Sequence, residues 1–222
     1  MKTKDKIQKF WKKIPDLRKA GCNLVIVLLR YLYYYVRFRK EIIAHQKTTI
    51  NGIKKIEMAS GSRLEIGTRY RGILKKSDET LINVRGTLKI NGRVSISRGV
   101  IIDVDEKGIL ELEDGVVINS FTMIVCADKT IIGEGTEIGW GCHFLDSDFH
   151  ESSFMGGKFL SSPIIIGKNV RIGHHVHIEK GVFIADRCRI RQNSIIDRCF
   201  TEPGCMISTK REYGMVKYPE RS

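Results

Sequence analysis

The sequence lacks several signals that would place the protein among metal-binding, disulfide-linked or membrane-spanning proteins. Its six cysteines form no C-x-x-C pair and no zinc-ligand spacing, so we interpret them as free thiols in a reducing cytoplasm. The first residues, MKTKDKIQKFWKK, alternate charged and apolar side chains, and no secretory cleavage site follows them. No uninterrupted apolar run reaches the roughly 20 residues of a membrane span. These absences favour a cytoplasmic protein.

Acidic residues are scarce at one end of the chain. Residues 1–60 hold 15 Lys/Arg against 4 Asp/Glu, which is +11 of the total net charge of +13, and the remaining residues are nearly neutral. A nucleic-acid groove along the whole fold would need a more even distribution of positive charge. The charge distribution therefore indicates a local anionic partner, and we expect no nucleic acid.

The basic segment 1–48 is predicted to be a helical extension made of two amphipathic helices, with Pro15 interrupting the chain between them. The second helix, from Leu17 to about Ala44, contains the apolar stretch AGCNLVIVLLRYLYYYV, which Arg30 breaks. Its tyrosines and flanking cations are typical of a helix at a membrane interface. We therefore predict contact between residues 1–45 and an anionic membrane surface. The alternatives are packing on the rest of the fold or in an oligomer, and a true span.

Beyond residue 60 the sequence changes to short apolar runs punctuated by Gly and Asn, which is typical of strands and turns. Near the C-terminus a period of six is clear, and a small or aliphatic residue follows each isoleucine four places later. The isoleucines are Ile166, Ile172, Ile178, Ile184, Ile190 and Ile196, and the followers are Val170, Val176, Val182, Cys188 and Ser194. This period suits neither an α-helix nor a hairpin, but it suits a triangular coil of about 18 residues whose three sides each contribute one large inward residue.

The same register continues towards the N-terminus, with one interruption. It includes Ile132, Ile138 and Phe144, and more loosely Ile90, Ile96, Ile102, Leu112, Ile118 and Ile124. Phe144 and Ile166 are separated by 22 positions, which is not a multiple of six, so a loop is predicted over residues 146–163. A loop leaving a rigid scaffold is a natural place for function. The coil is expected to cover residues 49–208, followed by a tail over 209–222, with Cys142 and Cys188 in the core.

The repeat units IGKNVR, IGHHVH and IGEGTE resemble those of the hexapeptide-repeat acyltransferases. The segment IIGEGTEIGWGCHFLDSDFH, followed by a loop and SSPIIIGKNVRIG, is most similar to the polysaccharide and galactoside O-acetyltransferases, and the resemblance covers roughly residues 86–208. It implies an all-β solenoid, a left-handed parallel β-helix, assembled as a homotrimer with active sites between subunits. The implied reaction transfers an acetyl group from acetyl-CoA to a sugar or polysaccharide hydroxyl.

The resemblance also implies roles for individual residues around the loop. The histidine that closes the D-x-D-x-H-like segment is the general base in these enzymes, and that position is His150. An imidazole near its working pKa can take the proton of a sugar hydroxyl while the oxygen attacks the thioester. Asp146 and Asp148 are candidates for orienting the ring. Asn119 matches an asparagine that binds the acceptor in the galactoside enzymes.

For coenzyme A the resemblance implies backbone groups along the late coils and a cation for the phosphates. The corresponding positions are Gly173, His174 and Gln192 for the late coils, and Arg198 for the cation. The family places a Thr-Lys pair where this chain has Asp197 and Arg198, so the cation is kept and its neighbour is not.

A metal site is not expected. The related γ-class carbonic anhydrases bind zinc on this fold through two histidines five positions apart and a third from another coil. This sequence has His174, His175 and His177 together but no H-x₄-H pair.

Two other functions remain open from the sequence. One is N-acetylation of a nucleotide-linked amino sugar, which would use the same histidine chemistry without a membrane. The other is a non-catalytic β-helix scaffold, because Arg191, Gln192 and Asn193 stand where the family prefers small residues.

Overall fold

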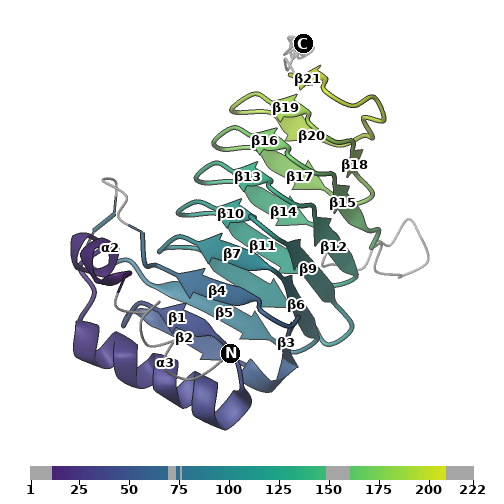
Figure 1. The fold of residues 1–222 in the computed structure, drawn as a ribbon. Helices are drawn as coiled ribbons and strands as arrows, with labels where there is room; N and C mark the ends of the chain where they lie inside the picture. The colour runs from purple at the N-terminus through teal and green to yellow at the C-terminus, as the bar shows by residue number, and fades with distance from the viewer. Residues whose placement is uncertain (1–11, 70–73, 76, 149–160, 209–222) are drawn as a thin grey trace, which may run out of the picture.

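The computed structural model shows a triangular solenoid of three parallel sheets, with helices at its N-terminal end (Figure 1). The structure describes residues 12–69, 74–75, 77–148 and 161–208. The predicted fold class, a left-handed parallel β-helix with an N-terminal helical extension, is confirmed.

Each coil contributes one strand in turn to three sheets, named A, B and C here, and every pairing between named strands is parallel. Sheet A contains β1 (Ile42–Ala44), β4 (Arg63–Ile66), β7 (Arg93–Ile96), β10 (Val117–Ile118), β13 (Glu137–Ile138), β16 (Arg171–Ile172), β19 (Arg189–Ile190) and β21 (Met206–Ile207). Sheet B contains β2 (Thr48–Asn51), β5 (Thr80–Val84), β8 (Ile101–Val104), β11 (Met123–Cys126), β14 (His143–Leu145), β17 (His177–Glu179) and β20 (Ile195–Ile196). Sheet C contains β3 (Ile56–Met58), which follows a 3₁₀ turn at Ile53–Lys55, then β6 (Thr87–Asn91), β9 (Ile109–Glu113), β12 (Lys129–Ile132), β15 (Ile164–Ile166) and β18 (Phe183–Ile184).

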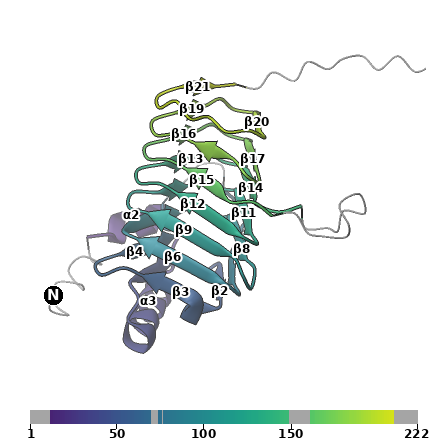
Figure 2. The ribbon, with the colours of Figure 1, turned by 90° about the vertical axis from the view of Figure 1, so that its right-hand side faces the viewer.

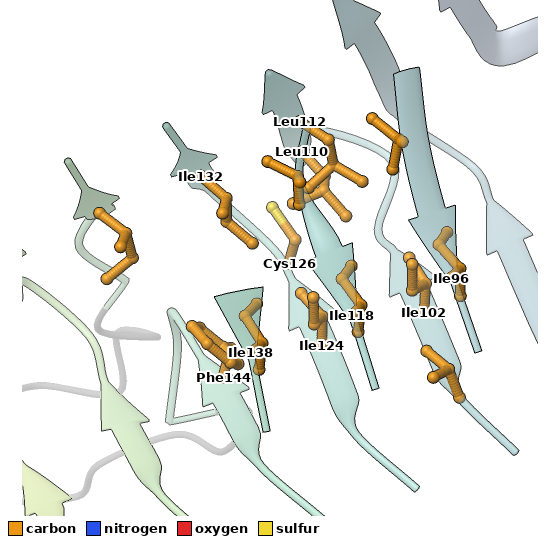
Figure 3. Packing of buried hydrophobic residues seen from close by; sticks show 14 of the residues in the cluster. Ile96, Ile102, Leu110, Leu112, Ile118, Ile124, Cys126, Ile132, Ile138 and Phe144 are labelled. Atoms are coloured by element: carbon orange, nitrogen blue, oxygen red, sulfur yellow. The ribbon is translucent and has the colours of Figure 1, made fainter. Parts of the chain in front are cut away.

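The core is the stack of inward side chains that the period of six predicted. Figure 3 shows Ile102, Ile124 and Phe144 following one another on sheet B, and all three are fully buried. The C-terminal coils keep the 18-residue length, since Ile178 pairs with Ile196. The earlier coils are longer because their strands point a second apolar residue inward, as Leu110 does beside Leu112. Cys142 and Cys188 are fully buried, as predicted.

The helical extension differs from the prediction in its bounds. Pro15 lies in the first turn of helix α2 (Ile14–Lys19), where a missing N–H leaves no helical hydrogen bond unmade. Most of the first predicted helix lies outside the described residues, so its interruption by Pro15 stays a prediction. The chain then turns at Gly21, with φ of 74°, and the Asn23 side chain caps helix α3 (Leu24–Phe38) by accepting from the Ile26 N–H. Because β1 already begins at Ile42, the first coil starts before the predicted boundary at residue 48.

Helix α3 crosses the N-terminal end of the solenoid in both views (Figures 1 and 2). Its Val27 and Tyr31 pack with Leu17 of α2 and Ile43 of β1, and its Tyr34 joins the main core. Arg30 points back at the first coil and donates to the carbonyls of three residues, His45, Gln46 and Thr48. One face of α3 therefore covers the N-terminal end of the hydrophobic core. Within the described ranges no helix has both the length and the apolarity that a bilayer span requires.

Candidate active site

The predicted loop leaves the solenoid at the edge between sheets B and C. Strand β14 ends at Leu145 and β15 begins at Ile164. Between these strands, Ser147 and Ser161 pair in an isolated antiparallel β-bridge. The Ser162 N–H donates to the carbonyl of Asp146 at 3.0 Å, and the Gly181 N–H of the next coil donates to the Ser162 carbonyl at 3.0 Å. Both ends of the loop are thus bonded to each other and to the scaffold.

Asp146 is fully buried and its carboxylate is directed at the preceding coil. It accepts from the backbone N–H groups of Ala127 at 2.7 Å and Asp128 at 3.2 Å, and from the Thr130 hydroxyl at 3.4 Å. A buried carboxylate that satisfies two backbone donors holds the local backbone in place. Asp146 therefore fixes the point where the loop departs.

Asp148 lies two residues further on and forms an ion pair with Lys180, one coil later at the same edge. His150, the predicted general base, lies outside the described residues. The structure thus describes Asp146 and Asp148, the two predicted aspartates that precede His150, at the point where the loop leaves the solenoid. The assignment of His150 stays a prediction.

The outer face of sheet B carries two histidines that the sequence analysis did not assign to the site. His143 of β14 and His177 of β17 are register partners, and their ring centroids are 4.7 Å apart in an edge-to-face arrangement. Burial, with the neighbouring His177 and His175 adding to it, lowers the pKa of His143. His143 is thus an uncharged imidazole near neutral pH. The sequence contains one signal for this pair: each histidine directly precedes a large inward residue, Phe144 or Ile178, so both histidines belong to the outer face of a strand.

The opposite edge, between sheets A and B, holds most of the remaining predicted residues. Asn119 and Gly173 occupy equivalent corners of different coils, and the Asn119 side-chain amide donates to the Ile138 carbonyl at 2.7 Å. A Cβ on Gly173 would lie 2.5 Å from the backbone nitrogen of Gln192, so only glycine allows these two coils to approach. The Gly173 N–H itself donates to the Ile190 carbonyl at 2.9 Å. Gly173 and Gln192 are therefore neighbours, as one binding surface would require.

His174 and Trp140 form a stacked pair beside them. Their ring centroids are 4.8 Å apart and their planes are inclined by 4°, while Trp140 remains 44% exposed. His174 Nδ1 is 2.9 Å from Nδ1 of His175. The stack makes a flat aromatic platform on the solenoid edge, of the kind that can stack on a base or a sugar ring.

Arg198 is not in this group. It is exposed at the edge between sheets B and C, where its guanidinium lies over the Phe200 ring at 5.8 Å from the centroid. The four residues predicted to bind coenzyme A therefore lie on two edges of the triangle and not in one cluster within the chain. The reason is geometric, because a third of a coil separates successive corners and the strand of sheet B lies between them.

The buried thiols are poorly suited to nucleophilic catalysis. Burial raises the pKa of Cys142 to about 11. Burial, with the Asp146 carboxylate nearby, also raises the pKa of Cys126. Both stay protonated near neutral pH and pack as apolar groups. Among the residues that the structure describes, no group of three or more His, Cys, Asp or Glu side chains could hold a metal ion.

Comparison with known proteins gave relatives in sequence and in structure. The chain is 31% identical over 191 residues to an uncharacterized 24.8 kDa protein in the cps region of Klebsiella pneumoniae, and the match covers 86% of each chain. No protein-family model matches the chain.

Two solved structures are similar in fold. The polySia-specific acetyltransferase NeuO is 14% identical, with a TM-score of 0.43 over 78% of this chain and 91% of that one. A hexapeptide-repeat-containing acetyltransferase from Vibrio cholerae O1 biovar eltor, complexed with acetyl coenzyme A, is 16% identical, with a TM-score of 0.32 over 86% and 81% of the two chains. The sequence relationship shows the family: the chain belongs to the same family as the K. pneumoniae cps-region protein, and its fold is a left-handed parallel β-helix built on a six-residue repeat.

Proposed function

We propose that this protein is an acetyl-CoA-dependent O-acetyltransferase acting on a sugar or on a polysaccharide or lipopolysaccharide precursor, with His150 as general base. The observation that carries the proposal is the root of the segment Asp146–His150. It leaves the solenoid at an edge where Asp146 is buried and bonded to the coil behind it and Asp148 is paired with Lys180. His150 follows the Asp146 anchor by four residues in the sequence, so the chain length alone limits the distance between their Cα atoms to about 14 Å.

The chemistry needs one base and no covalent intermediate on the enzyme. His150 takes the proton of the acceptor hydroxyl as its oxygen attacks the thioester carbonyl, and a backbone N–H stabilises the tetrahedral oxyanion. The intermediate then collapses, the carbon–sulfur bond breaks, and the histidine returns the proton to the departing thiolate. Asp148 is the candidate for orienting the imidazole, while Asp146 acts through the shape of the loop.

Acetyl-CoA is a co-substrate in this proposal. Its binding between two subunits would account for predicted coenzyme A residues that lie on two different edges of one chain. Arg198 would hold phosphate groups, and the late-coil corners at Gly173, His174 and Gln192 would line the pantetheine arm. In a homotrimer, the edge between sheets A and B of one subunit would face the edge between sheets B and C of its neighbour. The residues that lie apart within one chain, Asn119 included, would then share a site.

The acceptor class rests on the motif and on the genetic setting of the relative. The K. pneumoniae protein is named for a cps region, a capsule region, which fits a polysaccharide or lipid-linked precursor. We place the enzyme in the cytoplasm, peripheral at the inner face of the membrane, where such precursors are assembled.

The experiment is thiol release from acetyl-CoA in the presence of a panel of glycans, comparing the native chain with His150→Ala. Removal of a general base should lower acceptor-dependent release by about 10²- to 10⁴-fold. Acetyl-CoA binding, measured by calorimetry, should persist in the variant and serves as its folding control. Release that survives the substitution would reject His150 as the base. Transfer only to amino groups of nucleotide sugars would favour N-acetylation, and a native chain that neither binds acetyl-CoA nor releases thiol would favour a scaffold.

A further inference from the structure

Helix α3 presents an apolar face to solvent. Six large apolar side chains are exposed along it: Val25 at 67%, Ile26 at 42%, Leu29 at 61%, Leu32 at 37%, Tyr33 at 57% and Val36 at 69%. With 3.6 residues per turn, their positions fall within an arc of about 120°. Single exposed apolar residues are ordinary on a protein surface, but a contiguous stripe of this length is not.

The stripe lies opposite the face that packs on the solenoid. The inward residues Val27, Tyr31 and Tyr34 centre about 180° from the middle of the stripe. Of the two arginines in the helix, Arg30 is turned to the first coil, and Arg37 is exposed at the edge of the stripe. Helix α3 lies at the N-terminal end of the solenoid (Figures 1 and 2) and packs on it through the opposite face, so the stripe is directed away from the solenoid.

The surroundings of the stripe are strongly basic. Residues 12–40 contain eight Lys/Arg and a single acidic residue, Asp16. Lys12 is exposed just before α2, Arg18 and Lys19 are exposed in its last turn, and Arg37 and Arg39 are exposed at the C-terminal end of α3. Cations at both ends of an apolar helical face, together with an exposed tyrosine, are the features of a helix that lies in the interface of an anionic bilayer.

We infer that the outward stripe of α3, Val25 to Val36, is the membrane-contact surface of this protein and that its partner is an anionic lipid bilayer. A second copy of the chain fits the stripe less well, because two such faces would bring the arginines at their ends together. The inference rests on the proposed function only where it names a lipid-linked acceptor.

This contact would set the height of the active site. With α3 flat on the bilayer, the solenoid stands upright on the membrane. Sheet B runs in the order β2, β5, β8, β11, β14, so the root of the loop at the end of β14 is four strand spacings from the first coil. At about 4.8 Å per spacing, the site lies about 20 Å beyond the first coil. That geometry favours an acceptor sugar several residues away from its lipid, in place of one attached directly to the lipid phosphate.

The test uses the full-length chain and vesicle co-sedimentation. Vesicles of phosphatidylcholine are compared with vesicles that also contain phosphatidylglycerol. The variant Leu29→Gln/Val36→Gln removes apolar surface from the centre of the stripe without changing the charge, and both positions are more than 60% exposed, so the fold should be kept. Met206→Gln, at an apolar position 64% exposed at the far end of the solenoid, is the matched control.

The native chain and Met206→Gln should bind the phosphatidylglycerol vesicles and bind pure phosphatidylcholine weakly. The double variant should lose about tenfold or more in vesicle affinity. Equal binding by the double variant and the native chain, or no vesicle binding by either, would overturn the inference. A change in sedimentation coefficient of the double variant without vesicle binding would assign the stripe to a second copy. Acetyl-CoA binding and thiol release with water-soluble glycans are measured in parallel, so a failure of the membrane contact and a failure of the proposed reaction give different results.

Discussion

Replacing Asp146 should show whether this carboxylate stabilises the fold or takes a direct part in catalysis. The Asp146→Ala variant leaves the N–H groups of Ala127 and Asp128 without their acceptor in a place where the carboxylate is fully buried. Each charge-assisted bond contributes about 1.5–3 kcal/mol, and water will replace part of it once the carboxylate is gone, so we expect a loss of about 3 kcal/mol. For a chain of this size that corresponds to a fall in the unfolding midpoint of about 6–12 °C.

The assay is thermal unfolding followed by far-ultraviolet circular dichroism, with the midpoint as the observable because a solenoid need not unfold in one step. Asp148→Ala is the matched control, since it removes a partly exposed ion pair with Lys180 and should cost less than about 1 kcal/mol. An unfolding midpoint of Asp146→Ala within about 1 °C of the native value would refute the anchoring role. Asp146 would then be available for a direct role beside the base.

Three further outcomes follow from described contacts. Burial, with the Arg98 charge added, lowers the pKa of His45 from 6.5 to about 4, so the unfolded chain takes up the proton first as the pH falls. The unfolding free energy should be intact above pH 6.5 and fall by up to about 3 kcal/mol towards pH 4, and denaturant titrations of His45→Gln should lose most of that dependence. Gly139→Ala would place a Cβ 2.5 Å from the Gly173 carbonyl oxygen, so calorimetry should show a loss of about 1–3 kcal/mol, and unchanged unfolding would contradict the tight corner. Arg30→Met removes the donors to the first-coil carbonyls, so hydrogen exchange should accelerate in α3 and not in the C-terminal coils; protection equal to the native chain would show that apolar packing alone holds the helix.

Sequence alone was sufficient for the regular part of the fold. A large inward residue at every sixth position can be buried only if each flat side of a coil contributes one, so the spacing of Ile172, Ile178 and Ile184 is enough to specify the triangular coil. The same count located the loop, because Phe144 and Ile166 are out of register. The clustering of charge in residues 1–60 and the apolar stretch around α3 were equally visible.

Residue neighbourhoods were decided by the tertiary structure. Whether His143 meets His177 depends on how many residues the loop between them contains, and a repeat pattern does not carry that length across an irregular coil. Gly173 and Arg198 matched one binding set in sequence, yet the path of the chain through sheet B places them on different edges of the triangle. Arg30 interrupts an apolar run in the sequence, but packing on the first coil turns it inward and leaves an apolar face outside. The periodicity of the sequence specifies the side of the coil to which a residue belongs. Whether two residues of different coils are in contact depends on the lengths and stacking of all the coils between them.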